Sequence, residues 1–149
     1  MIVYADASAL VKRYVAEAGS DEVIELTSAA SAVATALVSR AEVAAAFARA
    51  FRMGILDDES ARTAQRGFVQ DWPHFARIAI TEALAARAEA LAWDFGLRGY
   101  DAIQLAAALS WRDAVGQEVV LATFDRQLWD AAPDAGLEVW PAKPPGKKG

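Results

Sequence analysis

The chain has 149 residues, of which 55% are hydrophobic and 23% are charged, and its net charge is −5. This length fits one domain with a single core, and the residue balance excludes a disordered chain. No apolar stretch approaches the length of a membrane span, and no basic region leads into a signal-type apolar segment at the N-terminus. The absence of cysteine excludes disulfides and thiolate metal sites and fits a cytoplasmic location. The acidic balance argues mildly against a nucleic-acid partner held by charge alone.

Hydrophobic periodicity and the positions of glycine and proline predict alternating strands and helices. In chain order these are a strand at 2–5, helices at 8–17 and 20–28, a strand at 32–37, helices at 39–53 and 57–71, a strand at 77–80, helices at 81–95 and 101–113, a strand at 118–122, a helix at 125–132 and a strand at 137–140. Strands separated by helices favour parallel pairing. We therefore expect a three-layer α/β/α domain over residues 1–140, with a central parallel sheet of 4–5 strands, and a flexible Pro/Gly/Lys tail at 141–149.

Two aspartates follow predicted strands. Asp6 comes directly after the first strand, and Asp125 comes three residues after Ala122, near the end of the fourth. The carboxyl ends of parallel strands lie at one edge of a sheet, and ligands bind there at the point where the strand order reverses. If the first and fourth strands are neighbours, as in the order 3-2-1-4-5, both carboxylates point into one cleft.

Two further acidic residues lie near helix starts and can reach the same cleft. Asp101 begins a predicted helix, and Glu42 lies one turn into another, with Val38 and Ala46 as apolar or small neighbours on its face. Carboxylates gathered from four segments favour a site for hard divalent cations, which prefer oxygen ligands and serve phosphate chemistry. Because these four residues contribute −4 to the net charge and bound cations would offset it, the overall charge leaves the partner undecided.

Helix capping is a competing interpretation of each of these acids. Ser39 and Glu42 have the spacing of a capping box, Asp101 has the same spacing to a glutamine, and Asp6 and Asp125 both suit an N-cap position. Capping and cation binding are compatible, because positive helix N-termini ease the mutual repulsion of the carboxylates. The sequence leaves both roles open for each residue.

Four short motifs carry a resemblance to a known family. They are Asp-Ala-Ser-Ala-Leu-Val-Lys at 6–12, Ser-Arg-Ala-Glu-Val at 39–43, Leu-Arg-Gly-Tyr-Asp-Ala at 97–102 and Thr-Phe-Asp-Arg-Gln-Leu at 123–128. In this order they resemble the motifs of PIN-domain ribonucleases, in particular the toxins of bacterial and archaeal VapBC toxin–antitoxin pairs. The resemblance covers residues 2–140. One departure is Gln104, where many relatives have histidine, at a position that is not one of the acidic ligands.

The resemblance implies a metal site made by the four acids. The family's acidic quartet falls on Asp6, Glu42, Asp101 and Asp125, and the implied cation is Mg²⁺ or Mn²⁺. Asp6 and Asp101 are the implied direct ligands. The other two acids would complete the shell, in part through water or a second metal.

The resemblance also implies roles for residues around the quartet. Ser8 and Thr123 match small hydroxyl positions that hold a ligand water, although helix capping or strand-end hydrogen bonding explains them equally well. Arg98 lies in a matched motif three residues before Asp101, and we expect it to contact phosphate. For Arg13 we expect surface ion pairing instead.

The implied reaction is hydrolysis of RNA phosphodiester bonds by a water that the cation activates and that Asp101 or Glu42 orients or deprotonates. The only histidine, His74, lies beside Pro73 and outside the motifs, so a ribonuclease-A-like pair of histidines is excluded. A toxin that inhibits translation, a cognate antitoxin covering the acidic cleft and a homodimer are implied in the same way.

Aromatic residues on the predicted helices have two possible roles. Phe47, Phe51 and Phe68 either pack in the core or form a groove for an antitoxin or a dimer partner. Trp93 and Trp111 fall at positions consistent with core packing, which we expect in preference to stacking on a base.

Two other functions compete with the nuclease. A haloacid-dehalogenase-like phosphatase also has an aspartate after its first strand, but it requires a second aspartate two residues later, where this chain has Ser8. A non-catalytic PIN-like module would bind RNA or a partner protein without turnover. The presence of all four acids favours an active enzyme over such a module.

Overall fold

Five parallel strands form the central sheet of the protein, described by a computed structural model over residues 1–146. The strands are β1 (Ile2–Ala5), β2 (Ala32–Ala36), β3 (Ala76–Ile78), β4 (Val120–Ala122) and β5 (Glu138–Trp140). Their order in the sheet is β3-β2-β1-β4-β5, and every neighbouring pair is parallel, so the predicted parallel pairing is confirmed and the condition that β1 and β4 are neighbours is met. None of the helices within residues 1–146 has the length and hydrophobicity of a transmembrane span.

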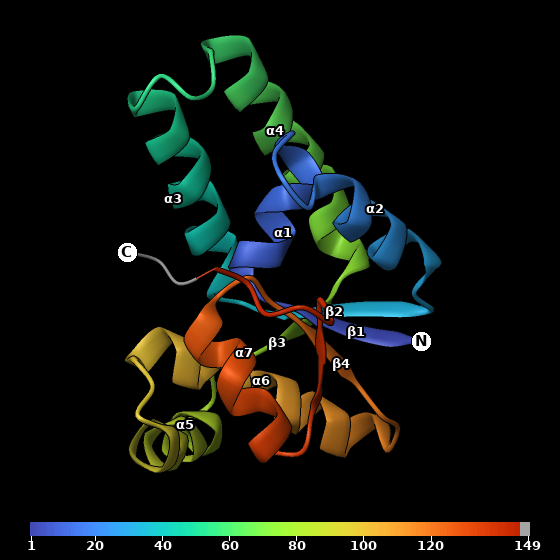
Figure 1. Cartoon of the computed structure of the whole chain (residues 1–149), viewed down its shortest axis with the longest axis vertical. Helices are drawn as coiled ribbons and strands as arrows, with labels where there is room; N and C mark the ends of the chain where they lie inside the picture. The colour runs from blue at the N-terminus through green and yellow to red at the C-terminus, as the bar shows by residue number, and fades with distance from the viewer. Residues whose placement is uncertain (147–149) are drawn as a thin grey trace.

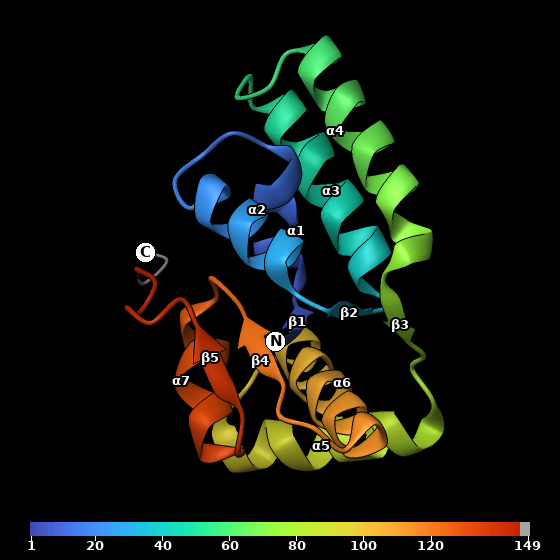
Figure 2. The ribbon, with the colours of Figure 1, turned by 90° about the vertical axis from the view of Figure 1, so that its right-hand side faces the viewer.

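Helices cover both faces of this sheet, which confirms the predicted three-layer arrangement (Figure 1). On one face lie α1 (Ala7–Tyr14), α2 (Ser20–Ala29), α3 (Ser39–Arg52) and α4 (Asp58–Asp71), followed by the short 3-10 helix η1 (Trp72–His74). On the other face lie α5 (Glu82–Phe95), α6 (Gly99–Val115) and α7 (Arg126–Asp134), as Figure 2 also shows. Because parallel strands must be joined by crossovers, the helices between them are placed on the two faces.

The pleat of β1 divides the core between the two layers. Val3 packs in the cluster under α1, α3 and α4, whereas its neighbour Tyr4 points to the opposite face, into the cluster formed by α5, α6 and α7. The first cluster is rich in aromatic rings, and Phe47 and Phe68 meet there edge to face at 6.3 Å between centroids. These two phenylalanines are therefore core residues, while Phe51 is half exposed.

Some predicted boundaries and one predicted core residue differ from the structure. The helix expected to begin at Asp101 begins two residues earlier, at Gly99. Trp111 is buried as expected, but Trp93 is 87% exposed, so its predicted core position is wrong. The buried side of α5 carries Leu84, Ala88 and Leu91. Trp93 lies about 200° around the helix from Leu91, because each residue advances about 100°.

The C-terminal segment that we predict to be a flexible tail begins after β5. Residues 141–146 have no regular secondary structure, and two side chains of α7 donate hydrogen bonds to them: Trp129 to the Pro141 carbonyl at 2.8 Å and Arg126 to the Pro145 carbonyl at 3.3 Å. Residues 147–149 of the predicted tail lie outside the described residues.

Candidate active site

A pocket of about 360 Å³ opens at the carboxyl edge of the sheet, beyond the ends of β1 and β4. These two strands are hydrogen-bonded neighbours, with Ala5 opposite Ala122, so the residues that follow them meet. The strand order reverses between them, which is where open α/β sheets bind ligands. The polar residues that line the pocket are Asp6, Ser8, Glu42, Arg98, Tyr100, Asp101, Gln104 and Asp125. The structure thus brings all four predicted acids together, with Ser8 and Arg98.

Asp6 is the most enclosed of these acids, with 4% of its surface exposed. It caps α1 by accepting a hydrogen bond from the Ala9 amide at 3.0 Å, so the capping and pocket interpretations both hold. The Ser8 hydroxyl donates to its Oδ1 at 2.6 Å, and the Thr123 hydroxyl donates to its Oδ2 at 2.6 Å. Burial raises the pKa of Asp6 to about 6, against the lowering effect of these hydrogen bonds.

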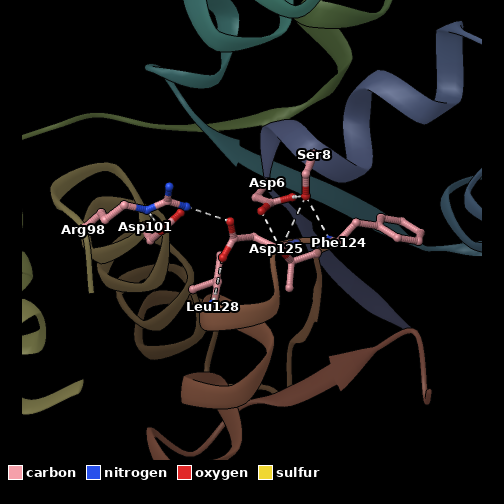
Figure 3. A network of polar contacts seen from close by, with 8 residues as sticks. Asp6, Ser8, Arg98, Asp101, Phe124, Asp125 and Leu128 are labelled. Carbon is pink, nitrogen blue, oxygen red and sulfur yellow. Dashed lines mark hydrogen bonds and ion pairs between the residues drawn. The ribbon is translucent and has the colours of Figure 1, made fainter. Parts of the chain in front are cut away.

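Ser8 and Thr123 join the two strand ends as well as holding Asp6. The Ser8 hydroxyl accepts a hydrogen bond from the Phe124 amide at 2.9 Å, and the Thr123 hydroxyl accepts one from the Asp125 amide at 3.0 Å. Figure 3 shows this network between the start of α1 and the segment after β4. The role observed for both hydroxyls is therefore to fix the Asp6 carboxylate, and a ligand water remains a prediction.

Glu42 does not form the capping box that its spacing suggested. The N-cap position of α3 is Val38, no side chain caps this helix, and the Ser39 hydroxyl instead accepts a hydrogen bond from Thr35 at 2.7 Å. The Glu42 carboxylate accepts a hydrogen bond from the Gln104 amide at 2.9 Å and lines the pocket. Burial raises its pKa; the bond from Gln104 opposes this rise, and the negative charge of Asp101 adds to it.

Gln104 is a site residue that the sequence interpretation passed over as a departure from the family. It is buried on α6, accepts a hydrogen bond from the Tyr4 hydroxyl at 2.5 Å, and donates to Ser39 at 3.0 Å as well as to Glu42. An amide in the middle of an otherwise apolar helix stripe was the signal available, because a buried amide needs several partners. Gln104 links α6, β1 and α3 beneath the pocket.

Arg98 connects the two remaining acids. Its Nε lies 3.2 Å from Asp101 Oδ2, and its Nη2 lies 3.0 Å from Asp125 Oδ2, as drawn in Figure 3. Asp125 also caps α7 by accepting a hydrogen bond from the Leu128 amide at 3.1 Å. Asp101 is not a cap, since Arg98 holds the N-cap position of α6. The capping interpretation is therefore confirmed for Asp6 and Asp125 and wrong for Glu42 and Asp101.

Three other charged or titratable residues take no part in the pocket lining. Arg13 pairs with Asp71 at 3.3 Å, which confirms its predicted ion pairing. Lys12 pairs with Glu17 at 3.2 Å and lies over the Phe124 ring. His74 ends the short helix η1 and is exposed.

The polar lining consists of four carboxylates, one guanidinium and uncharged donors, and oxygen is the ligand type that hard cations select. As the side chains stand in residues 1–146, no three acidic or histidine side chains surround one point closely enough to hold a metal ion. Two of the four carboxylates are turned toward Arg98 and a third toward Gln104. The donor chemistry thus fits a divalent cation, while the arrangement requires these side chains to turn.

A family model described as PIN domain matches residues 3–133. The chain belongs to the PIN domain family. It is 36% identical over 143 residues to "Ribonuclease VapC45" of Mycobacterium tuberculosis (strain CDC 1551 / Oshkosh), covering 95% of this chain and 96% of that protein. "Ribonuclease VapC49" of Mycobacterium tuberculosis (strain ATCC 25618 / H37Rv) matches with the same identity and coverage. The resemblance in the four motifs is thereby confirmed at the level of the family, and the phosphatase alternative is not supported.

Solved structures share the fold of this PIN domain. One is a toxin–antitoxin complex from Klebsiella pneumoniae, with a TM-score of 0.65 and 19% identity, covering 97% of this chain and 99% of that one. Another is VapBC2 from Rickettsia felis bound to a DNA fragment from its promoter, with a TM-score of 0.64 and 14% identity, covering 94% and 99%. At these identities the likeness extends to the fold alone.

Proposed function

We propose that this PIN domain is a metal-dependent endoribonuclease that hydrolyses RNA phosphodiester bonds and acts as the toxin of a toxin–antitoxin pair, inhibiting translation. The observation that carries the proposal is the gathering of four carboxylates, from four separate segments, in one pocket at the carboxyl edge of the sheet. The two relatives at 36% identity are both named ribonucleases, which supports RNA as the substrate.

The pocket would hold Mg²⁺ or Mn²⁺ through Asp6 and Asp101, with Asp125 and Glu42 completing the ligand shell directly or through water. When bound, such a cation stabilises the charge that develops at phosphorus and lowers the pKa of the attacking water. Asp6 is the fixed element, because two hydroxyls and an amide hold both of its oxygens in place.

Glu42 is the side chain best suited to accept a proton from the attacking water. Burial raises its pKa, and the Gln104 amide orients its carboxylate toward the pocket. The water oxygen forms a bond to phosphorus as one of its protons passes to Glu42, and the bond from phosphorus to the leaving ribose oxygen breaks, with that oxygen taking a proton from solvent water. Arg98 contributes a guanidinium at the pocket rim, where its planar donors match the oxygens of a phosphate.

A cognate antitoxin is the proposed protein partner, and a homodimer is the proposed oligomer. A groove between α3 and α4 supports the antitoxin as a partner, since the lining of this groove includes the half-exposed Phe51 together with Ala44, Ala48 and Ala61. An apolar helix face with a basic residue would cover this groove and reach the acidic pocket. A cytoplasmic location accompanies this proposal, because the RNA substrate lies there and the chain has no cysteine that would need oxidation.

The test is cleavage of a folded total-RNA pool by antitoxin-free protein in Mg²⁺ or Mn²⁺, with EDTA and an Asp101→Ala variant as controls. Discrete products that disappear in both controls would establish a metal-dependent endoribonuclease and provide the cleavage site for sequencing. If folded protein binds RNA yet leaves the whole pool intact under both cations, the non-catalytic PIN-like binding module becomes the better description.

A further inference from the structure

Arg98 differs in exposure from the two acids that it contacts. Its side chain is 68% exposed, whereas the side chains of Asp101 and Asp125 are 14% and 12% exposed. A long, solvent-exposed cation thus reaches over two nearly buried carboxylates, and Figure 3 shows its guanidinium between them.

The other two pocket acids are held in a different way. Asp6 accepts hydrogen bonds from two hydroxyls and a backbone amide, and Glu42 accepts one from the Gln104 amide, all of them uncharged donors. Uncharged donors orient a carboxylate but leave its negative charge in place. Arg98, in contrast, supplies a positive charge to the acids that it contacts.

A divalent cation bound to this quartet would draw on two carboxylates that Arg98 already contacts. The guanidinium takes Oδ2 of Asp101 and Oδ2 of Asp125, so Arg98 and the cation compete for these two atoms. Ion pairs of an exposed arginine are weakly held and carry an entropic cost, so a doubly charged ion can displace the side chain. A displaced guanidinium at the pocket rim keeps the planar donors that bind phosphate oxygens.

We propose that Arg98 is an exchangeable counter-ion of the pocket. It neutralises Asp101 and Asp125 until a divalent cation takes their oxygens, and it then binds a phosphate oxygen of the RNA beside the bond that is cleaved. This inference rests on the proposed nuclease function. It gives Arg98 two successive roles: the side chain first competes with the cation for the two carboxylates, and it then helps to bind the RNA.

The first experiment measures the Mn²⁺ affinity of the wild type, Arg98→Ala, Arg98→Lys and Arg126→Ala. The affinity is obtained from the concentration of free Mn²⁺ at equilibrium with each protein. Arg126 pairs with Asp130 outside the pocket lining, so its removal makes the same change in net charge and serves as the matched control. We expect Arg98→Ala to bind Mn²⁺ about fivefold more tightly, because the ion pairs of an exposed arginine no longer compete for the two carboxylates. Arg98→Lys should stay near the wild type, because the charge remains.

The second experiment measures RNA cleavage at saturating Mn²⁺ and the salt dependence of binding to a cleavage-resistant phosphorothioate RNA. Arg98→Ala should cleave about tenfold more slowly, since a charge-assisted contact is lost. With Mn²⁺ present, its plot of log affinity against log salt should be shallower than the wild-type plot by about 0.7, the effect of one phosphate contact to a single strand. In EDTA the salt slopes of the wild type and Arg98→Ala should agree, because Arg98 is then paired with Asp101 and Asp125 and does not contact the RNA.

Tighter Mn²⁺ binding together with slower cleavage supports the exchange, since a residue with a merely structural role would weaken both. Mn²⁺ binding by Arg98→Ala that is unchanged, weaker or matched by Arg126→Ala would overturn it. Unchanged cleavage, or an unchanged salt slope in Mn²⁺, would overturn the phosphate-binding role. Failure of the proposed function looks different: the wild type itself would then neither bind Mn²⁺ nor cut RNA.

Discussion

The two sides of the pocket hold their acids by different physical means. On the Asp6 side, formed by Asp6, Ser8 and Thr123, a buried carboxylate is fixed by uncharged donors that leave its charge for a ligand. On the Arg98 side, formed by Arg98, Asp101 and Asp125, an exposed cation offsets the charge of two carboxylates. The Asp6 side is therefore rigid and carries an uncompensated negative charge. On the Arg98 side the charge is neutralised by a side chain that a cation can replace.

The largest effect is expected from removing an acid on the Arg98 side. Asp101→Asn should lower RNA cleavage by about 10³-fold or more, because loss of a direct cation ligand removes several kcal/mol of transition-state stabilisation. Its free energy of unfolding in EDTA should change by about 1 kcal/mol or less, because its ion pair involves an exposed arginine. Cleavage rates and urea unfolding measure the two quantities, with the exposed Asp94→Asn as the control. An active Asp101→Asn enzyme would remove this residue from the proposed metal site.

The second prediction concerns pH and the Asp6 side. The pKa of Asp6 is raised from 3.8 to about 6, because the buried side chain is more stable when it is protonated. This stabilisation of the folded state is complete below about pH 4 and is lost as the pH rises through about 6. In EDTA, the wild type should therefore lose about 3 kcal/mol relative to Asp6→Asn between these limits. Urea unfolding of both proteins at pH 4, 5, 6 and 7 provides the measurement. A constant difference across this range would contradict a raised pKa for Asp6.

One of the two hydroxyls that hold Asp6, that of Thr123, can be removed without changing any charge. Thr123→Val keeps the shape of the fully buried side chain but removes the donor to Asp6 and the acceptor of the Asp125 amide. We expect the free energy of unfolding to fall by about 1–3 kcal/mol, the cost of leaving buried polar groups unpaired. The exposed Thr63→Val, on α4, is the matched control and should change stability by less than about 0.5 kcal/mol. Equal effects of the two substitutions would mean that the hydroxyl does not hold Asp6.

The smallest effect is expected at Gln104, which belongs to neither side and orients Glu42. Gln104→Leu should weaken Mn²⁺ binding about tenfold, within the range seen when a partner of a metal ligand is removed. Calorimetric titration of Mn²⁺ measures this, and circular dichroism verifies the fold. Gln104→Glu should weaken the binding as well, because its carboxylate keeps the contact with Tyr4 but cannot donate to Glu42 and repels it. Wild-type affinity in Gln104→Leu would show that the orientation of Glu42 does not depend on this amide.

Much of the fold followed from patterns within single segments. The run of apolar residues before Asp6 and the one ending at Ala122 mark β1 and β4, and alternation of strands with helices predicts their parallel pairing. Such patterns reflect burial and backbone periodicity, which act locally. They did not place Trp93, because α5 carries alanines on several sides and hydrophobicity alone therefore marks its buried stripe of Leu84, Ala88 and Leu91 only weakly.

The candidate site was predicted as a set of residues but not as a set of contacts. Convergence of Asp6, Glu42, Asp101 and Asp125 follows from their places at strand ends and helix starts. The hydrogen-bond and ion-pair partners of these acids could not be predicted in this way, because capping geometry and side-chain hydrogen bonds depend on the angle at which each helix leaves the sheet. The capping boxes suggested for Glu42 and Asp101 failed for this reason.

The sequence by itself determined the element order, the parallel sheet and the four carboxylates at its edge, since hydrophobic periodicity and the position of an acid after a strand are properties of the chain. Only the tertiary structure decided that neutral hydroxyls hold Asp6, that Gln104 orients Glu42 and that Arg98 bridges Asp101 and Asp125. Thr123 and Asp6 are 117 positions apart, and Gln104 and Glu42 are 62 apart. Contacts over such separations depend on how whole helices and strands pack, and that packing minimises exposed apolar surface over the entire domain.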